Sequence, residues 1–451
     1  METEVKWLWK TTQTESFYEI YTISYQLTLA TREPLLEEHL LQTLNHLFRK
    51  LPPLRACYGE RDGERWLREM TEIGLDFEVV SGATTQEVHK RLQSYSYNMN
   101  KGPLWCVKLL SEPPSSPEIP AGTDMEQFCH VYTLFLGLHH VITDGSSNMK
   151  ICGFLVQILD AVMGKRAIDT VEQLGVFVSD ERIQQLQRER VAAMEADLEL
   201  RRRVVDEIQS RDGKCSLVKS TFKGVGEKVP RTGMLEKTLD AESTMAFIKR
   251  CRSEGVTVNS AFTALASVAI VDLLVDGGLV QETYNIRSDH VLNARRYWGG
   301  DTSRYLGCHI LPLMPTVAKT PQKIDGKFWD FARSVHQGLQ KKVNEGAPLL
   351  AEAAKHFMLA NPDFDATFEY DFCVSNVGDV TSLVTEGGDR VQALHVIRTS
   401  ALHAAPCTWT LLVHTFRGRL ILALTYNSAF VNSQMAKKFC DGIFRHLQGV
   451  L

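Results

Sequence analysis

Apolar and polar positions alternate along the whole chain in blocks that predict helices and strands in turn. Leu40, Leu44 and Leu47 recur at helical spacing and predict an amphipathic helix over 35–50. The run 127–139 is apolar almost throughout, as an interior strand is. In the first part of the chain, we also predict strands at 16–30, 54–58 and 103–110, and a helix at 148–163.

A polar stretch separates this first block from a second one. Residues 179–211 are rich in Glu, Arg and Gln with a thin apolar stripe, which predicts an exposed helix, and a connection rich in Gly and Lys follows at 212–233. Beyond it, we predict strands at 233–239, 282–287, 290–294, 306–314, 371–375, 391–399, 408–417 and 419–426, and helices at 241–252, 259–274, 326–344 and near the C-terminus.

This organisation predicts a mixed α/β (α+β) protein in two halves of similar size. We place an N-terminal half at 1–176, a helical linker at 177–232 and a C-terminal half at 233–451. The length of 451 residues supports two domains, because it exceeds what one hydrophobic core usually spans.

Composition excludes several classes of function. The net charge is −4 and the basic runs are short, which disfavours a nucleic-acid partner. No apolar stretch reaches the roughly 18 residues that span a bilayer, and the N-terminus lacks a signal-peptide core. The ten cysteines are spread singly without a CxxC pair, as free thiols in a reducing cytoplasm are, so we expect a cytoplasmic protein.

The segment from His139 to Gly145 holds the clearest candidate chemistry. Two histidines follow an apolar strand, Asp144 comes four residues after His140, and Gly145 permits a turn with unusual dihedral angles. The histidine side chain has a pKa suited to proton transfer near neutral pH. As isolated residues, a histidine pair at a strand end is more often structural. A metal site is disfavoured, because adjacent side chains on an extended strand point to opposite faces.

The same segment matches HHxxxDG, the motif of the chloramphenicol acetyltransferase-like superfamily. That group includes condensation domains of peptide synthetases, alcohol acetyltransferases, polyketide-associated acyltransferases, the plant BAHD enzymes and dihydrolipoyl acyltransferase cores. Segments that resemble the superfamily in the expected order are Leu51–Arg55, Gly102–Leu104, Gly255–Asn259, Asn293–Arg295 and Ser375–Gly378. The resemblance covers the whole chain. It implies two chloramphenicol acetyltransferase-like sandwich domains with a channel at their interface.

The resemblance also implies roles for the residues of the motif. His140 is the expected general base, and His139 is expected to point away and serve packing. Asp144 is expected to be structural and to pair with Arg295 from the other half. Gly145 is expected to keep the loop compact and the channel open. For the partner of Asp144, Arg287 and Arg296 are the alternatives to Arg295.

A second group of residues comes from the SNxG-like segment. Ser375 corresponds to a hydroxyl residue that stabilises the tetrahedral oxyanion in some members of the superfamily. A turn residue capped by Asn376 is the equally weighted alternative. The plant BAHD branch is disfavoured, because Asp371-Phe372-Cys373 lacks the Gly-Trp-Gly that follows Asp-Phe in that branch.

The resemblance implies an acyltransferase that moves an acyl group from a thioester donor, acyl-CoA as co-substrate, to a small-molecule hydroxyl or amine acceptor. No metal, no redox cofactor and no covalent acyl-enzyme are expected, and the closest members in style are the free-standing alcohol acetyltransferases and polyketide-associated acyltransferases. The alternatives are a condensation-type enzyme that uses a carrier protein as donor, and a non-catalytic binding protein of the same fold. A serine hydrolase is disfavoured because no G-x-S-x-G segment occurs.

Overall fold

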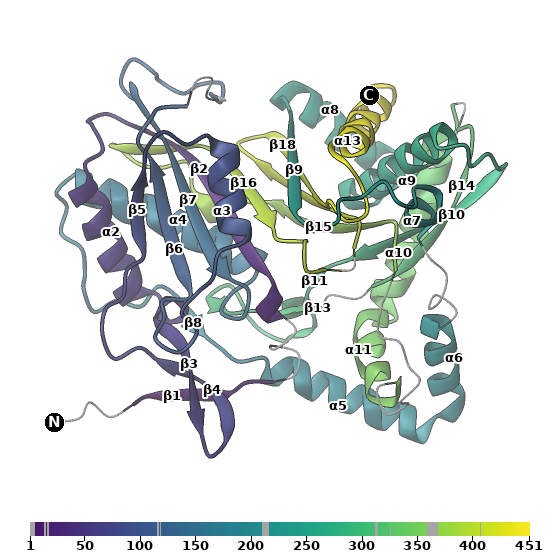
Figure 1. Ribbon diagram of the computed structural model, residues 1–451, viewed down its shortest axis with the longest axis horizontal. Helices are drawn as coiled ribbons and strands as arrows, with labels where there is room; N and C mark the ends of the chain where they lie inside the picture. The colour runs from purple at the N-terminus through teal and green to yellow at the C-terminus, as the bar shows by residue number, and fades with distance from the viewer. Residues whose placement is uncertain are drawn as a thin grey trace.

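Two mixed β-sheets lie side by side and form the frame of the molecule (Figure 1). This computed structural model describes residues 5–12, 15, 18–114, 117, 119–209, 216–311, 314–324, 326–358, 369–405 and 407–451. The helices pack against the two sheets, and the two extended helices α5 (Glu181–Ala196) and α6 (Leu198–Gln209) run from the first sheet towards the second along the lower side of Figure 1.

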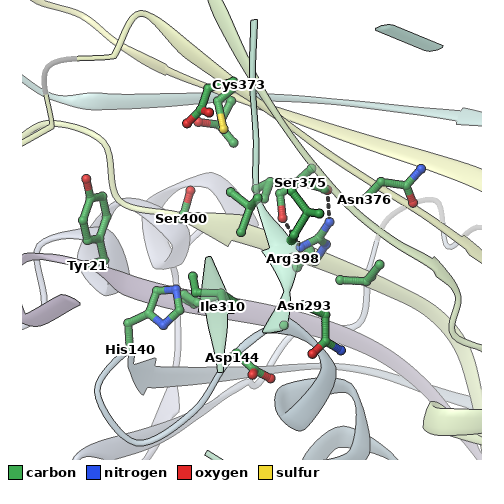
Figure 2. A pocket seen from close by; sticks show the side chains of 18 of the residues that line it. Tyr21, His140, Asp144, Asn293, Ile310, Cys373, Ser375, Asn376, Arg398 and Ser400 are labelled. Carbon is green, nitrogen blue, oxygen red and sulfur yellow. Dashed lines mark hydrogen bonds between the residues drawn. The ribbon is translucent and has the colours of Figure 1, made fainter. Parts of the chain in front are cut away.

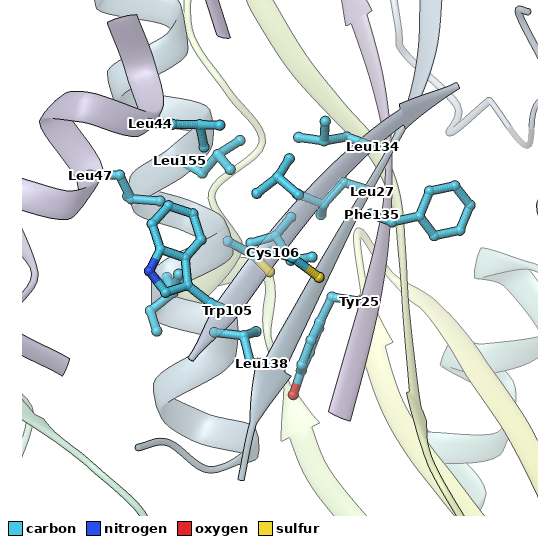
Figure 3. Packing of buried hydrophobic residues seen from close by; sticks show 14 of the residues in the cluster. Tyr25, Leu27, Leu44, Leu47, Trp105, Cys106, Leu134, Phe135, Leu138 and Leu155 are labelled. Carbon is cyan, nitrogen blue, oxygen red and sulfur yellow. The ribbon is translucent and has the colours of Figure 1, made fainter. Parts of the chain in front are cut away.

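The first sheet has the strand order β16-β2-β7-β6-β5, with only β5 and β6 parallel. Helices α2 and α4 pack against one another and against this sheet, and Leu44 and Leu47 of α2 and Leu155 of α4 belong to one buried cluster with Trp105 and Leu138 of the strands (Figure 3). Burying each such leucine contributes about 1.5–3 kcal/mol, so this layer is a main source of stability. The bounds of these elements are β2 Thr22–Thr31, β5 Phe77–Val80, β6 Trp105–Leu110, β7 His130–His139, β16 Val391–Ser400, α2 Glu37–Lys50 and α4 Gly145–Met163.

The second sheet has the order β14-β10-β15-β17-β18-β9, in which β15 is parallel to both β10 and β17. Helix α9 (Val258–Asp276) is, among the described residues, the one helix long and apolar enough to cross a membrane, so the expectation that no apolar stretch reaches that length is wrong. It packs as a core helix, because 78% of its apolar stretch is buried inside the protein. Around it lie α8 Ala241–Ser253, α10 Phe328–Asn344 and α13 Ser433–Gln448, and the strands are β9 Thr232–Leu239, β10 Thr283–His290, β14 Thr316–Pro321, β15 Phe372–Asp379, β17 Trp409–Phe416 and β18 Arg419–Asn427.

Smaller elements complete the described chain. A three-stranded sheet has the order β1-β4-β3, and two-stranded pairs join β8 to β12 and β11 to β13. Their bounds, with those of the remaining helices, are β1 Trp7–Lys10, β3 Ala56–Arg61, β4 Glu64–Glu69, β8 Val176–Phe177, β11 Leu292–Asn293, β12 Tyr305–Leu306, β13 Ile310–Leu311, α3 Thr85–Gln93, α7 Leu217–Thr221, α11 Ala347–Met358, α12 Thr381–Val384 and the 3-10 helices Tyr18–Ile20, Pro52–Arg55 and Ala294–Tyr297.

The mixed α/β class and the paired, two-lobed architecture confirm the fold predicted from the sequence. The division of the chain at 176 and 233 stays a prediction. One strand of the first sheet comes from beyond that division. Strand β16 comes from the second half of the chain but pairs with β2 of the first sheet, from Val391 opposite Thr31 to Ser400 opposite Ile23. The two halves therefore share a sheet.

Three predicted elements differ in the structure. The helix over 179–211 is two helices, because the Asp197 carboxylate accepts hydrogen bonds from the backbone N–H groups of Glu199 and Leu200 and caps a new helix. The strand over 306–314 is replaced by the short strands β12 and β13. The strand over 16–30 begins only at Thr22. Residues 210–215, in the predicted helix and connection, and 312–313 lie outside the described residues.

Candidate active site

His140 is the first residue after β7, the central strand of the first sheet. Its backbone N–H donates to the carbonyl of Tyr21, 3.2 Å away, which fixes it beside the start of β2. The Tyr18 ring stacks on the imidazole with ring centres 5.0 Å apart, and the Tyr21 ring meets it edge-on at 6.5 Å. The imidazole is thus held between two aromatic side chains.

The hydrogen bonding of His140 selects one tautomer. Its Nδ1 lies 2.9 Å from the carbonyl oxygen of Thr143, which can only accept, so Nδ1 carries the hydrogen and Nε2 has a free lone pair. The Cys308 thiol also lies 3.4 Å from Nδ1. Burial lowers the pKa of His140 below 6.5, with backbone interactions and Asp144 opposing the shift. At neutral pH the imidazole is therefore an uncharged proton acceptor.

His139 points to the opposite face of the strand, as the extended backbone predicts. It is 3% exposed, meets the rings of Tyr58 and Tyr97 edge-on, and accepts a hydrogen bond at Nδ1 from the Val141 N–H (3.3 Å). Burial lowers its pKa to about 3. These contacts are those of a packing residue, and His139 does not line the cavity described below.

Asp144 and Arg295 form the predicted ion pair between the two halves of the chain. Arg295 Nη1 donates to Asp144 Oδ2 at 2.7 Å, and both side chains are buried, at 6% and 1% exposed. Burial alone would raise the pKa of Asp144, but the charge of Arg295 and the N–H of Ser147 hold it far below its usual value. The N–H of His309 donates to the same carboxylate oxygen (2.9 Å).

Asp144 is also the N-cap of α4, because its Oδ1 accepts the Ser147 N–H at 2.9 Å. Arg295, rather than Arg287 or Arg296, is the partner. One carboxylate thus orients the loop after β7, begins α4 and anchors the loop that precedes β13. It forms no described hydrogen bond with the His140 imidazole, and it acts on the base through the position of the loop and through its charge, which opposes the lowering of the His140 pKa.

One expectation for Gly145, a turn with unusual dihedral angles, is wrong. Its φ angle is not in the left-handed region, so no unusual dihedral requires a glycine there. Space requires it, since a Cβ at this position would lie 3.1 Å from Val377 Cγ1 and 3.4 Å from Arg398 Nη1. The absence of a side chain lets the first turn of α4 approach β15 and β16.

Ser375 lies within β15 and faces the same cavity as His140 (Figure 2). Its Oγ accepts a hydrogen bond from Arg398 Nη1 at 3.1 Å, which leaves the hydroxyl hydrogen available to another acceptor. Asn376 lines the cavity too, but its Oδ1 accepts the Gly378 N–H (2.8 Å) and supports the local turn. Asn376 therefore caps the turn, whereas Ser375 is free to donate.

Arg398 is a site residue that the sequence analysis missed. It is 3% exposed, and its Nη2 donates to the carbonyls of Ser375 and Val413. Burial lowers its pKa to about 10, which leaves it charged at neutral pH. No carboxylate pairs with it among the described residues. A charged residue within the apolar strand 391–400 was the available signal.

A cavity of about 270 Å³ brings these side chains together between the two sheets. His140 and Gly145 face it from the first half of the chain, and Ser375 and Arg398 face it from strands that follow residue 370. Tyr21, Asp289 and Cys373 also line it and were not predicted from the sequence. Whether the expected channel opens on both sides stays a prediction.

The described residues contain no group of three or more His, Cys, Asp or Glu side chains arranged to hold a metal ion. Among the polar groups of the cavity walls are the neutral base His140, the Ser375 hydroxyl and the buried cation of Arg398. Such a set can deprotonate a nucleophile and stabilise negative charge that develops on an oxygen.

No known family profile matches the sequence, and no curated protein is significantly similar to it. The fold, in contrast, is shared with many solved structures. The condensation domain of the monacolin K polyketide synthase MokA superposes with a TM-score of 0.67 at 11% identity, over 99% of this chain and 98% of that one.

Two further structures share the fold with a TM-score of 0.63 and 12% identity. Trichothecene 15-O-acetyltransferase TRI3 from Fusarium sporotrichioides is covered over 92% of its chain by 96% of this one. Polyketide synthase associated protein 5 from Mycobacterium tuberculosis matches over 98% of both chains. At such identities the likeness shows the fold alone, and it confirms the chloramphenicol acetyltransferase-like architecture predicted from the HHxxxDG motif.

Proposed function

We propose that this protein is an acyltransferase that moves an acyl group from a thioester donor, acyl-CoA, to a hydroxyl or amine acceptor. The observation that carries the proposal is the His140 imidazole, whose Nδ1 is tied to the Thr143 carbonyl and whose Nε2 is free at the inter-sheet cavity. The fold, which condensation domains and an acetyltransferase share, supports the same reaction class.

The reaction follows from these positions. His140 Nε2 accepts the proton of the acceptor as its oxygen or nitrogen attacks the thioester carbonyl. The carbonyl oxygen becomes negatively charged in the tetrahedral intermediate, and collapse of that intermediate expels the thiolate. The imidazolium then gives its proton to the thiolate, which restores the neutral base. No covalent acyl-enzyme is needed, because both substrates bind in one cavity.

Ser375 and Arg398 are suited to stabilise the oxyanion. The Ser375 hydroxyl accepts from Arg398 Nη1 (3.1 Å) and can donate its own hydrogen into the cavity. A hydroxyl polarised by a buried guanidinium is a stronger donor than an isolated one. Arg398 acts through Ser375 and is therefore a positioning residue, whereas Ser375 and His140 are the proposed catalytic residues.

A second cavity supports acyl-CoA as the donor. It has a volume of about 460 Å³, and Lys90 and Arg231 line it. Leu402 lines the first cavity and the neighbouring His403 lines the second, so the two are separated by a short stretch of chain. The Lys90 cation suits a phosphate group of CoA, and Arg231, which pairs with Glu227 at 2.8 Å, supplies a second positive charge at the same cavity. The protein would then act in the cytoplasm, where acyl-CoA is available, with no other cofactor.

A condensation-type reaction, with the acyl group bound to a carrier protein, is the second candidate. The shared fold with the condensation domain of MokA favours it. The two candidates differ in the donor and use the same base. A non-catalytic binding role would leave without a use the Nε2 of His140 and the charge of Arg398, which no described carboxylate neutralises.

Release of free thiol from acetyl-CoA, with panels of alcohols and amines as acceptors, tests the proposal. We expect release that depends on the acceptor and is lost in His140→Ala. Because burial lowers the pKa of His140, the rate should rise with pH along a limb that lies below 6.5 and be level near neutrality. Thiol release that needs no acceptor and is unchanged in His140→Ala would contradict the proposal.

A further inference from the structure

A second ionisable side chain lines the inter-sheet cavity without a role in the proposed chemistry. Asp289 lies near the end of β10, opposite Cys373 of β15, and is 2% exposed. The Met314 N–H donates to its Oδ1 at 2.8 Å, and the backbone of His290 also favours its charged form. Among the described residues, no side chain hydrogen-bonds or ion-pairs with this carboxyl group.

Arg398, the cation that lines the same cavity, bonds to Ser375 and Val413, and no charged side chain among the described residues forms an ion pair with Asp289. Within the cavity its neighbours Tyr21, Tyr370, Cys373 and Cys407 are uncharged at neutral pH, because burial raises the pKa of each phenol and thiol.

Lys355 of α11 is close enough to lower the pKa of Asp289, but it pairs with Glu352 at 2.8 Å, and the Glu352 charge acts on Asp289 in the opposite direction. His290 bonds to Ser288 Oγ, and burial lowers its pKa to about 3, so it is neutral as well. Burial raises the pKa of Asp289 to about 7, and a bound cation would bring back its charged form.

Asp289 lies within reach of the proposed reaction centre. The Tyr21 ring meets the His140 imidazole at 6.5 Å, and the same side chain lies close enough to Asp289 for the carboxylate to raise the pKa of the phenol. Tyr21 therefore connects the base to the carboxyl group along the cavity wall. All three residues line one cavity, so a ligand that places its nucleophilic atom at His140 and extends past Tyr21 would approach Asp289.

We propose that Asp289 selects an acyl acceptor that carries an ammonium group apart from its nucleophilic atom. The inference rests on the proposed acyl transfer. A buried carboxylate without a partner is costly, and a cationic group offsets that cost where a neutral hydroxyl does not. The rings of Tyr21 and Tyr370 favour a cation in the same place.

Two linear alcohols, aminopentanol and hexanol, test this inference, because they differ only in an ammonium group that replaces a terminal methyl group. Binding of each to the full-length protein is measured by calorimetry, and kcat/KM by thiol release from acetyl-CoA. We expect a preference of about 10- to 100-fold for aminopentanol at pH 8, as one charge-assisted hydrogen bond provides. The preference should shrink as the pH falls through about 7 and Asp289 is protonated.

The variant Asp289→Asn should bring the ratio between the two alcohols close to one. Asp371→Asn is the matched control, since Asp371 is a buried carboxyl group near the start of β15 that bonds to Ser216 and Val218 and does not line the cavity. It should leave the ratio as it is in the wild type. His140→Ala should lose turnover yet keep the binding preference, which separates this inference from the proposed reaction. Equal binding of both alcohols by the wild type, or an unchanged ratio in Asp289→Asn, would overturn it.

Discussion

Gly145 lies where the first turn of α4 approaches β15 and Arg398. Gly145→Ala would place a Cβ 3.1 Å from Val377 and 3.4 Å from Arg398. We expect turnover to fall by up to about 100-fold, since a shift of about 1 Å at a site can cost that much. Gly338→Ala is the control, because nothing lies within 4 Å of its added Cβ. Equal turnover in the two variants would contradict the role of space at Gly145.

The buried ion pair of Asp144 and Arg295 should contribute to the stability of the fold. Asp144→Asn should destabilise the protein by about 3–5 kcal/mol, because it leaves a buried guanidinium without its counter-charge. Lys10→Met, which breaks the exposed pair with Glu64, should cost only about 0–1 kcal/mol. Denaturant unfolding of both variants measures the difference.

The pH dependence of this pair has a definite sign. The folded pKa of Asp144 is lowered, so its stabilisation is present above about 3.9, the pKa of an unfolded aspartate, and is lost as the pH falls towards the folded value. The free energy of unfolding of the wild type should therefore exceed that of Asp144→Asn at neutral pH, and the difference should disappear in acid. An advantage that did not change with pH would argue against the pair.

At the scale of elements, β15 and β16 bring the proposed oxyanion donor and its cation together from different sheets. Ser375→Ala and Arg398→Met should each lower turnover by about 10²–10³. If Arg398 acts through Ser375, the double variant should lose little more than either single one.

Arg417→Met provides the control for this double-mutant cycle. Arg417 donates to the Ala393 carbonyl of β16 (3.1 Å) and does not line the cavity, so its loss should affect stability and combine additively with Ser375→Ala. Additive effects of Ser375→Ala and Arg398→Met on the activation free energy would show that the two residues act independently.

Periodic patterns predicted the elements that are strongly apolar or clearly amphipathic, such as α2, α9, β7 and β18. They failed where a local interaction outweighs periodicity, as at Asp197, whose cap begins α6. The location of β16 in the first sheet could not be predicted either, because pairing with β2 is a long-range contact that leaves no local signal. The same holds for the site. The motif predicted the ion pair of Asp144 with Arg295, but Arg398 and Asp289 could be assigned to the site only once the arrangement of the strands was known.

At the scale of the whole molecule, the two cavities predict where the donor binds. Lys90 lines the second cavity. If acyl-CoA binds there as proposed, Lys90→Ala should raise the KM for acetyl-CoA severalfold with little change in kcat, because the amine would contact phosphate rather than the reacting thioester. The KM for a thioester of pantetheine that lacks the phosphates should not change. Lys437→Ala on the outer side of α13 is the control for loss of a surface charge. Equal effects on both donors would contradict this assignment.

The association of the two sheets explains why the site needs the complete fold. His140 comes from the first sheet, Ser375 from the second, and Arg398 from the strand that joins the first sheet from the second half of the chain. The cavity lies between the two sheets, and its proposed chemistry depends on how the sheets orient these three side chains. The proposed reaction depends above all on His140, whose Nε2 is free, as the base in this cavity.

Turnover of His139→Ala and His140→Ala in one thiol-release assay tests that claim most directly. The two residues are adjacent, and their side chains lie on opposite faces of the strand, one packed against Tyr58 and Tyr97 and the other at the cavity. We predict that turnover of His140→Ala is about 10²–10⁴-fold lower than that of the wild type, while the variant keeps its fold. His139→Ala should lower the melting temperature and keep most of its turnover. Loss of turnover in folded His139→Ala, with near-normal turnover in His140→Ala, would contradict the account.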